Sequence, residues 1–190
     1  MIPFRYAEAA ALVPLLHVRP GPTVVRVAGP LSVLLAVEAL RWRDTREVWV
    51  DQPVPVKDSR IKPVPTKGTF NHTGMFDIVL LSPEMDPEGY QPILKKGGVI
   101  QASTYDLKKI AGLREKIKRM TGAAVPYRET LPEPLWFVLG CSGSTPRRVR
   151  RPPDGAQRIT ERFLPALFSF GKDELPFIFG AEKQQLVDGR

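Results

Sequence analysis

Two carboxylates, Glu84 and Asp86, follow an apolar run at residues 78–81. A near-continuous apolar run is typical of a strand that is buried on both faces, as in parallel sheets. Ligands bind beyond the carboxyl ends of such strands, where these two side chains would lie. A carboxylate within hydrogen-bond reach of a reacting group can accept a proton from it. The pattern therefore predicts an acid–base site, with Glu84 and Asp86 as candidate catalytic residues.

A second apolar run at residues 99–100 leads directly into Gln101. Strand, crossover and strand form a right-handed βαβ unit. We expect a short helix between the strands, beginning at Asp86 and ending at Gly97-Gly98. Both strands would then end at the same edge of the sheet. The segments 82–86 and 101–105 would both border the site.

The first half of the chain shows a strand at residues 23–28, Gly29-Pro30, an apolar helix at 31–40, a second strand at 47–50 and then Asp51. Nucleotide-binding α/β domains have this order, with a glycine turn beside the ligand and an acidic residue on the ribose. Gly29 and Asp51 are 22 positions apart, against about 20 in such domains. A plain strand-to-helix turn and an ordinary strand-terminal aspartate explain the same residues equally well, because the run has a single glycine.

The remaining elements predict the fold class. Residues 52–74 form a long proline-containing connection, which is either a set of shortened elements or a loop over the site. Residues 106–120 have one apolar face and are predicted to be helical. Strands at 123–129 and 135–141 are expected to pair antiparallel. The prediction is an α/β, Rossmann-like, mostly parallel sheet closed by a C-terminal antiparallel hairpin.

Composition divides the chain into three parts: an N-terminal helical arm (1–22), the α/β domain (23–141) and a basic Pro/Arg linker with an aromatic C-terminal segment (142–190). The formal net charge is +8. The basic segment 147–151 could contact an acidic protein or nucleic acid, and a solvated tail is the equally weighted alternative. We also expect a homo-oligomer.

Metal chemistry and membrane insertion are not predicted. Two histidines and one cysteine, Cys141, give no zinc-ligand spacing, and no apolar run approaches the roughly 20 residues of a membrane span. The N-terminus lacks the order of features in a signal peptide. A cytoplasmic location is therefore the expectation.

The order of elements resembles the class I S-adenosylmethionine-dependent methyltransferase fold, and within it the spermidine synthase (aminopropyltransferase) family. Four segments are similar to that family's motifs: the aspartate-rich turn, the following strand, the last strand and a C-terminal element, at residues 76–87, 95–103, 135–142 and 163–168. The resemblance implies S-adenosylmethionine or decarboxylated S-adenosylmethionine as donor and a small-molecule amine as acceptor. Donor contacts would come from Gly29, Asp51, Ser82 and Gln101.

The sequence also departs from the family. The glycine-rich turn is reduced to Gly29 and its neighbours, and the first, catalytic aspartate of the aspartate-rich turn is replaced by Ser82 or Pro83. Asp86 matches the second aspartate, and Glu84 could replace the lost base. Two main hypotheses follow: an aminopropyl or methyl transferase, and a catalytically degenerate fold that serves as a structural, assembly or nucleic-acid-associated binding module. A nucleotide-binding regulator that uses only the Gly29–Asp51 crevice is a third.

Overall fold

One seven-stranded sheet forms the centre of the molecule, with strand order β3-β2-β1-β4-β5-β7-β6. The computed structural model describes residues 3–65, 73–129, 134–152, 156 and 159–179. Five neighbouring strands run parallel, and β7 pairs antiparallel with both of its neighbours, β5 and β6. The predicted fold class is therefore confirmed. The strands are β1 (Thr23–Ala28), β2 (Thr45–Val50), β3 (Ile61–Pro63), β4 (Phe76–Leu81), β5 (Leu94–Thr104), β6 (Ala124–Glu129) and β7 (Leu135–Cys141).

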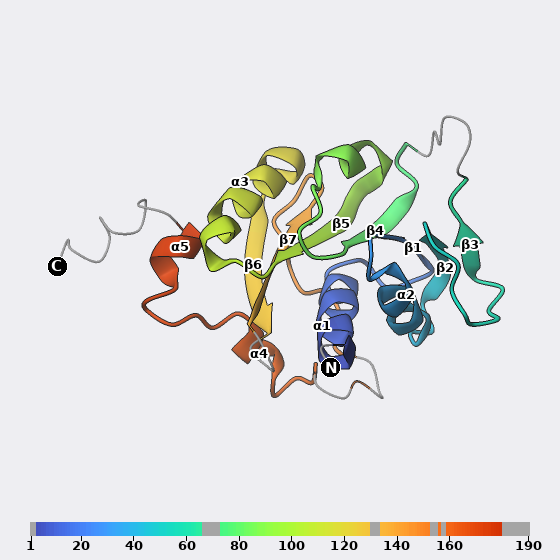
Figure 1. The fold of residues 1–190 in the computed structure, drawn as a ribbon, viewed down its shortest axis with the longest axis horizontal. Helices are drawn as coiled ribbons and strands as arrows, with labels where there is room; N and C mark the ends of the chain where they lie inside the picture. The colour runs from blue at the N-terminus through green and yellow to red at the C-terminus, as the bar shows by residue number, and fades with distance from the viewer. Residues whose placement is uncertain (1–2, 66–72, 130–133, 153–155, 157–158, 180–190) are drawn as a thin grey trace.

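Helices cover both faces of this sheet. α1 (Pro3–Leu15) and α2 (Ser32–Leu40) lie side by side (Figure 1) and pack with α4 (Leu164–Leu167) on one face. α3 (Ile110–Thr121) and α5 (Leu175–Phe179) pack on the other face. Each face has its own apolar core, because successive residues of a buried strand point to opposite sides. In the described part of the chain, no helix is long and apolar enough to cross a membrane.

The register brings the carboxyl ends of the central strands to one edge. Ala28 at the end of β1 pairs with Leu81 at the end of β4, and Leu80 pairs with Gln101 of β5. The turns that follow β1, β2 and β4 therefore open at the same edge of the sheet. This is the edge at which ligands bind in open parallel sheets, and it is where the sequence places the candidate site.

Two elements differ from the expectation. The helix predicted between Asp86 and Gly98 is a 3-10 helix, η1 (Glu88–Ile93), which contains Pro92 and is followed directly by β5. Residues 159–170 have helical apolar spacing in the sequence, but only the four residues of α4 are helical. Pro165 lies in the first turn of α4, and because proline is tolerated only there, the helix does not extend further toward the N-terminus.

The long connection after β2 contains a short strand. β3 pairs parallel with β2, from Val48↔Ile61 to Val50↔Pro63. Pro63 ends this strand at the edge of the sheet, a position that tolerates a residue without a backbone N–H. The sequence allows either shortened elements or a loop over the site in this connection. Its described part contains the short strand β3, as the first alternative predicts. Residues 66–72 lie outside the described part.

Candidate functional site

Glu84 and Asp86 line one hollow beyond the carboxyl ends of β4 and β5. Its volume is about 440 Å³, and α3 forms its far wall. The sequence predicts that these two carboxylates share a site, and the structure places them together in this hollow. The other lining residues include Met85, Ser103, Thr104, Lys109, Gly112, Leu113 and Lys116.

Glu84 occupies an unusual backbone conformation. Its φ of 66° lies in the left-handed region, which non-glycine residues rarely adopt. The Glu84 N–H donates to the carbonyl oxygen of Ser103 at 2.9 Å, which ties the turn after β4 to the end of β5. Such conformations persist where the surroundings determine them and are concentrated at functional sites. Here the strained residue carries one of the two site carboxylates.

The Glu84 carboxylate is held by three donors. It accepts hydrogen bonds from Thr104 Oγ1 at 2.7 Å, the Tyr105 N–H at 3.0 Å and Lys109 Nζ at 3.0 Å. These donors stabilise the charged form, so the pKa of Glu84 is lowered, with the Thr104 hydrogen bond as the largest cause. Glu84 is therefore ionised at neutral pH. It can accept a proton or a hydrogen bond, but a low pKa makes it a weak base.

Asp86 is more exposed. Its Oδ1 accepts from the Glu88 N–H at 3.1 Å and from Lys116 Nζ at 3.2 Å, and these contacts lower its pKa, the Glu88 N–H being the larger cause. The site therefore presents two carboxylates, each beside one lysine ammonium group. Exposed ion pairs of this kind contribute little to stability. An ammonium group of a ligand could therefore exchange with either lysine at small cost.

The turn after β1 lies against the turn after β4. Gly29 has φ +94°, and a Cβ there would lie 2.2 Å from Met85 Sδ and 2.8 Å from Ser82 Oγ. Ser82 is buried, donates to the Ala28 carbonyl oxygen at 2.9 Å and accepts from the Leu31 N–H at 2.9 Å. The Ser82 hydroxyl is thus used inside the fold, and the Met85 side chain rests on Gly29.

Asp51 lies at the end of β2 as expected and forms an ion pair with Arg26 of β1. Arg26 is buried and also donates to the Trp49 carbonyl oxygen at 3.2 Å. The side chain of Asp51 remains 37% exposed. A carboxylate has about four acceptor positions, so Asp51 can accept further hydrogen bonds while Arg26 holds it.

Gln101 does not line the hollow. It is fully buried on β5, between Leu80 of β4 and Leu139 of β7 in register. Neither its Oε1 nor its Nε2 has a hydrogen-bond partner among the residues that the structure describes. Buried amides without partners are rare in native structures. The structure thus separates Gln101 from Glu84 and Asp86.

Sequence reasoning missed the lysines and the arginine that contact these carboxylates. The sequence alone favours a solvated helix surface for Lys109 and Lys116, but their spacing of seven residues, about two helical turns, puts both on one face. Arg26 interrupts an otherwise apolar strand, whose six residues are all buried. A charge inside such a strand is the signal that could have indicated a buried partner.

Within the described residues, no group of three or more histidine, cysteine, aspartate or glutamate side chains is placed to hold a metal ion.

No protein-family model and no curated protein sequence matches the chain. Solved structures do match. The chain is similar to spermidine synthase from Thermotoga maritima, with TM-score 0.72 and 18% identity over 92% of this chain and 74% of that one. Spermidine synthase in complex with the transition state analogue AdoDATO matches with TM-score 0.73 and 18% identity, covering 92% and 75%.

A tRNA (m1A58) methyltransferase from Aquifex aeolicus is a more distant match, with TM-score 0.52 and 17% identity over 76% of this chain and 71% of that one. Identities this low show the fold alone. The similarity extends over most of the chain and agrees with the strand order described above. The chain therefore has the class I methyltransferase fold, as a divergent member that is similar to spermidine synthase.

Proposed function

We propose that the chain transfers a methyl or aminopropyl group from an S-adenosyl donor to a small-molecule amine. The observation that carries this proposal is the position of Glu84 and Asp86 in one hollow at the carboxyl edge of the sheet, in a chain whose fold is similar to that of spermidine synthase. S-adenosylmethionine and decarboxylated S-adenosylmethionine are the two candidate donors.

The donor's adenosyl group would lie across the ends of β1 and β2. Asp51 would accept hydrogen bonds from the ribose hydroxyls, since its carboxylate is partly exposed. Gly29 would allow the ligand to approach the backbone closely, because it lacks a side chain. Met85 rests on Gly29 and would have to move aside. Methionine has three flexible torsions, which keeps the cost of that movement low.

The acceptor amine would bind to the carboxylates of the hollow. Such a donor supplies a carbon bonded to a sulfonium sulfur, which an uncharged amine attacks while the carbon–sulfur bond breaks and its electron pair passes to sulfur. Glu84 would accept the proton that the amine nitrogen loses. Asp86 would hold a second ammonium group of the acceptor in the position where Lys116 now lies.

Turnover of a labelled donor tests this proposal directly. With a diamine acceptor, Glu84→Gln should reduce turnover by about a hundredfold, the lower end of what a positioned base contributes, because the lowered pKa makes Glu84 a weak base. Donor affinity should be unchanged, because Glu84 contacts the acceptor. Glu115→Gln, an equal charge change on the exposed face of α3, is the matched control. Wild-type protein with no turnover of either donor would contradict the proposal.

A second candidate is a catalytically degenerate binding module. Two contacts favour it: Met85 occupies the space beside Gly29, and Arg26 holds Asp51. Donor turnover by Met85→Ala separates the two candidates. It should raise donor affinity in both cases, because a ligand no longer has to displace the side chain. A transferase would also turn the donor over, whereas a module would bind it without reaction.

A further inference from the structure

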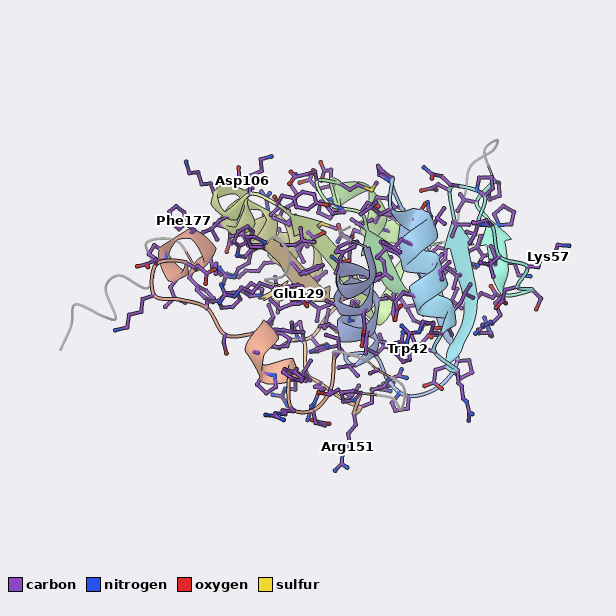
Figure 2. All side chains as sticks on the ribbon, turned by 60° about the horizontal axis from the view of Figure 1, so that its bottom comes forward. Trp42, Lys57, Asp106, Glu129, Arg151 and Phe177 are labelled. Carbon is purple, nitrogen blue, oxygen red and sulfur yellow. The ribbon has the colours of Figure 1, made fainter. Side chains whose placement is uncertain are left out.

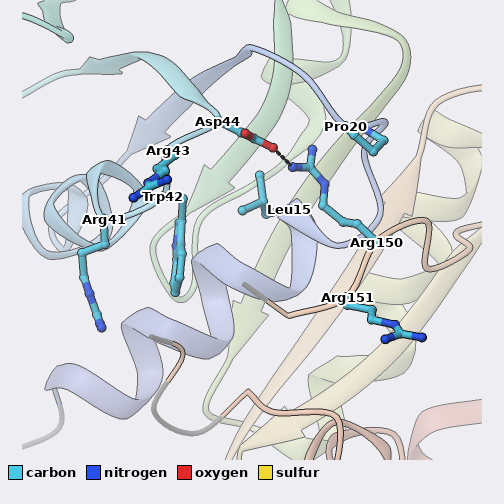
Figure 3. Close-up of a pocket in the computed structure, with 8 residues that line it drawn as sticks. All are labelled: Leu15, Pro20, Arg41, Trp42, Arg43, Asp44, Arg150 and Arg151. Carbon is cyan, nitrogen blue, oxygen red and sulfur yellow. Dashed lines mark hydrogen bonds and ion pairs between the residues drawn. The ribbon is translucent and has the colours of Figure 1, made fainter. Parts of the chain in front are cut away.

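A second pocket lies at the opposite edge of the sheet from Glu84 and Asp86. Its volume is about 550 Å³, and it borders the amino ends of β1 and β2, where the Thr23 N–H donates to the Asp44 carbonyl oxygen at 2.7 Å. Figure 3 shows Arg41 and Arg43 on one side and Arg150 and Arg151 on the other. The remaining lining residues are Leu15, Pro20, Trp42 and Asp44.

Two of the four arginines are neutralised by carboxylates. Arg41 pairs with Glu38 at 2.9 Å. Arg150 pairs with Asp44 and donates to the carbonyl oxygens of Val18 at 3.2 Å and Arg19 at 2.8 Å. These contacts fix the C-terminal segment against the start of β1. They make Arg150 a structural part of the pocket wall.

The other two arginines carry uncompensated charge. Arg43 and Arg151 are exposed, and neither has an ion pair or hydrogen bond within the described ranges. Figure 2 shows Arg151 extending outward from the body of the molecule, so it can turn onto a ligand. Trp42 is 95% buried in the pocket wall, and its Nε1–H also lacks an acceptor among the described residues. The pocket therefore offers donors and positive charge without a matching anion.

We propose that this pocket binds a small organic phosphate that carries at least two phosphoryl groups, such as a nucleoside diphosphate. Guanidinium groups donate paired hydrogen bonds that match phosphate oxygens. Arg43 and Arg151 line the pocket from different segments of the chain, which suits a ligand with two anionic groups. The volume lies within the usual range for small-molecule sites, about 300–1,000 Å³.

The charge pattern favours a small ligand over a nucleic-acid strand. A strand binds through a row of free cations along its backbone. In the 147–151 segment, Arg148 pairs with Glu161 at 2.6 Å and Arg150 with Asp44, so the row is interrupted. The uncompensated charges of Arg43 and Arg151 instead line one pocket. This site is independent of the transferase proposed above, because it lies at the other edge of the sheet.

Calorimetric titration with inorganic pyrophosphate and with ADP at low salt tests the site. Both should bind one to one. The Arg43→Ala/Arg151→Ala double variant should weaken binding by about tenfold or more, because it removes two guanidinium groups that would donate charge-assisted hydrogen bonds to the phosphates. Arg119→Ala, which removes an exposed arginine from α3 on the far face of the sheet, should leave affinity unchanged.

Absence of binding of both probes at millimolar concentration would overturn the proposal, as would equal weakening by Arg119→Ala. Titration with single-stranded oligonucleotides of increasing length tests the alternative, a site for a nucleic-acid strand. Affinity that rises with strand length and exceeds that of ADP would show a polymer site instead. Melting curves of the double variant that match the wild type would confirm that any loss reflects the pocket and not unfolding.

Discussion

Ser82 links the neighbouring strands β1 and β4 at the edge that forms the candidate site. Its hydroxyl donates to the Ala28 carbonyl oxygen and accepts from the Leu31 N–H, both at 2.9 Å. One buried side chain thus fixes the turn that enters α2. The position of Gly29 depends on this turn, so the shape of the proposed donor site depends on Ser82.

Ser82→Ala should lower the free energy of unfolding by about 1–3 kcal/mol, because it leaves a buried backbone donor without its acceptor. Urea denaturation measures the change. Ser169→Ala removes an exposed hydroxyl that donates to the Pro165 carbonyl oxygen at 3.1 Å and should stay within about 0.5 kcal/mol of wild type. Equal stability of both variants would show that the Ser82 contacts are not needed.

At the scale of single residues, the sequence predicts only part of the candidate site. The apolar run before Glu84 and Asp86 places both carboxylates at a strand end, and in the structure both line the same hollow. Their lysine partners, and the contact of Met85 with Gly29, join segments that are far apart in the chain. Such contacts depend on side-chain packing, which periodicity does not encode.

Gly140 controls how closely α3 packs on the sheet. It lies in β7, and a Cβ there would be 2.4 Å from Ile117 Cγ2 and 2.6 Å from Thr121 Oγ1. Both neighbours are buried, so they cannot move aside easily. The absence of a side chain at Gly140 thus lets α3 reach the position from which Lys109 and Lys116 contact the hollow.

Gly140→Ala should destabilise the protein by about 1–3 kcal/mol through overpacking. Gly112→Ala is a useful contrast, because no atom lies within 4 Å of its added Cβ. It should stabilise α3 by roughly 0.5–1 kcal/mol, the cost of glycine within a helix. Thermal unfolding followed by circular dichroism compares the two. A neutral Gly140→Ala would mean that α3 does not pack as described.

Regular elements were predictable where apolar periodicity was strong, and less so elsewhere. The strands ending at Ala28 and Leu81 and the antiparallel hairpin follow from β-branched or apolar runs, and each agrees with the observed pairing. η1 and α4 differ from the expected helices, because Pro92 and Pro165 shorten what the capping residues and the apolar spacing suggest. Local proline geometry therefore outweighed the hydrophobic pattern.

The N- and C-terminal segments meet at His17. Its Nδ1 lies 2.7 Å from the Val13 carbonyl oxygen, and its ring centroid is 6.5 Å from that of Phe168. Burial lowers the pKa of His17 below its usual 6.5, and the charge of Arg148 lowers it further. The folded state thus favours the neutral imidazole, while the unfolded chain protonates at the usual pKa.

Because the folded pKa is the lower one, the unfolded state binds more protons as the pH falls through 6.5. The contribution of His17 to stability is therefore complete above that pH, and it is lost as the pH falls toward the folded pKa. Urea denaturation at several pH values measures the slope of the free energy of unfolding against pH. His17→Gln should reduce it, and identical slopes in the two proteins would contradict the assignment.

At the scale of the whole molecule, opposite edges of the sheet carry opposite chemistry. The carboxyl edge holds Glu84 and Asp86 in a hollow suited to amines, and the amino edge holds an arginine-lined pocket. The sequence indicates the net charge of +8 and the basic 147–151 segment. It could not indicate that Arg43 and Arg151 line the same pocket, because they are brought together only by the fold.

Calorimetric titration with methylthioadenosine, S-adenosylmethionine and decarboxylated S-adenosylmethionine tests the central claim most directly. The account predicts one-site binding of at least one of the three, abolished by Asp51→Ala and preserved in Asp173→Ala, which removes a carboxylate from the C-terminal segment. No binding of any of the three at millimolar concentration would contradict a donor site at the ends of β1 and β2.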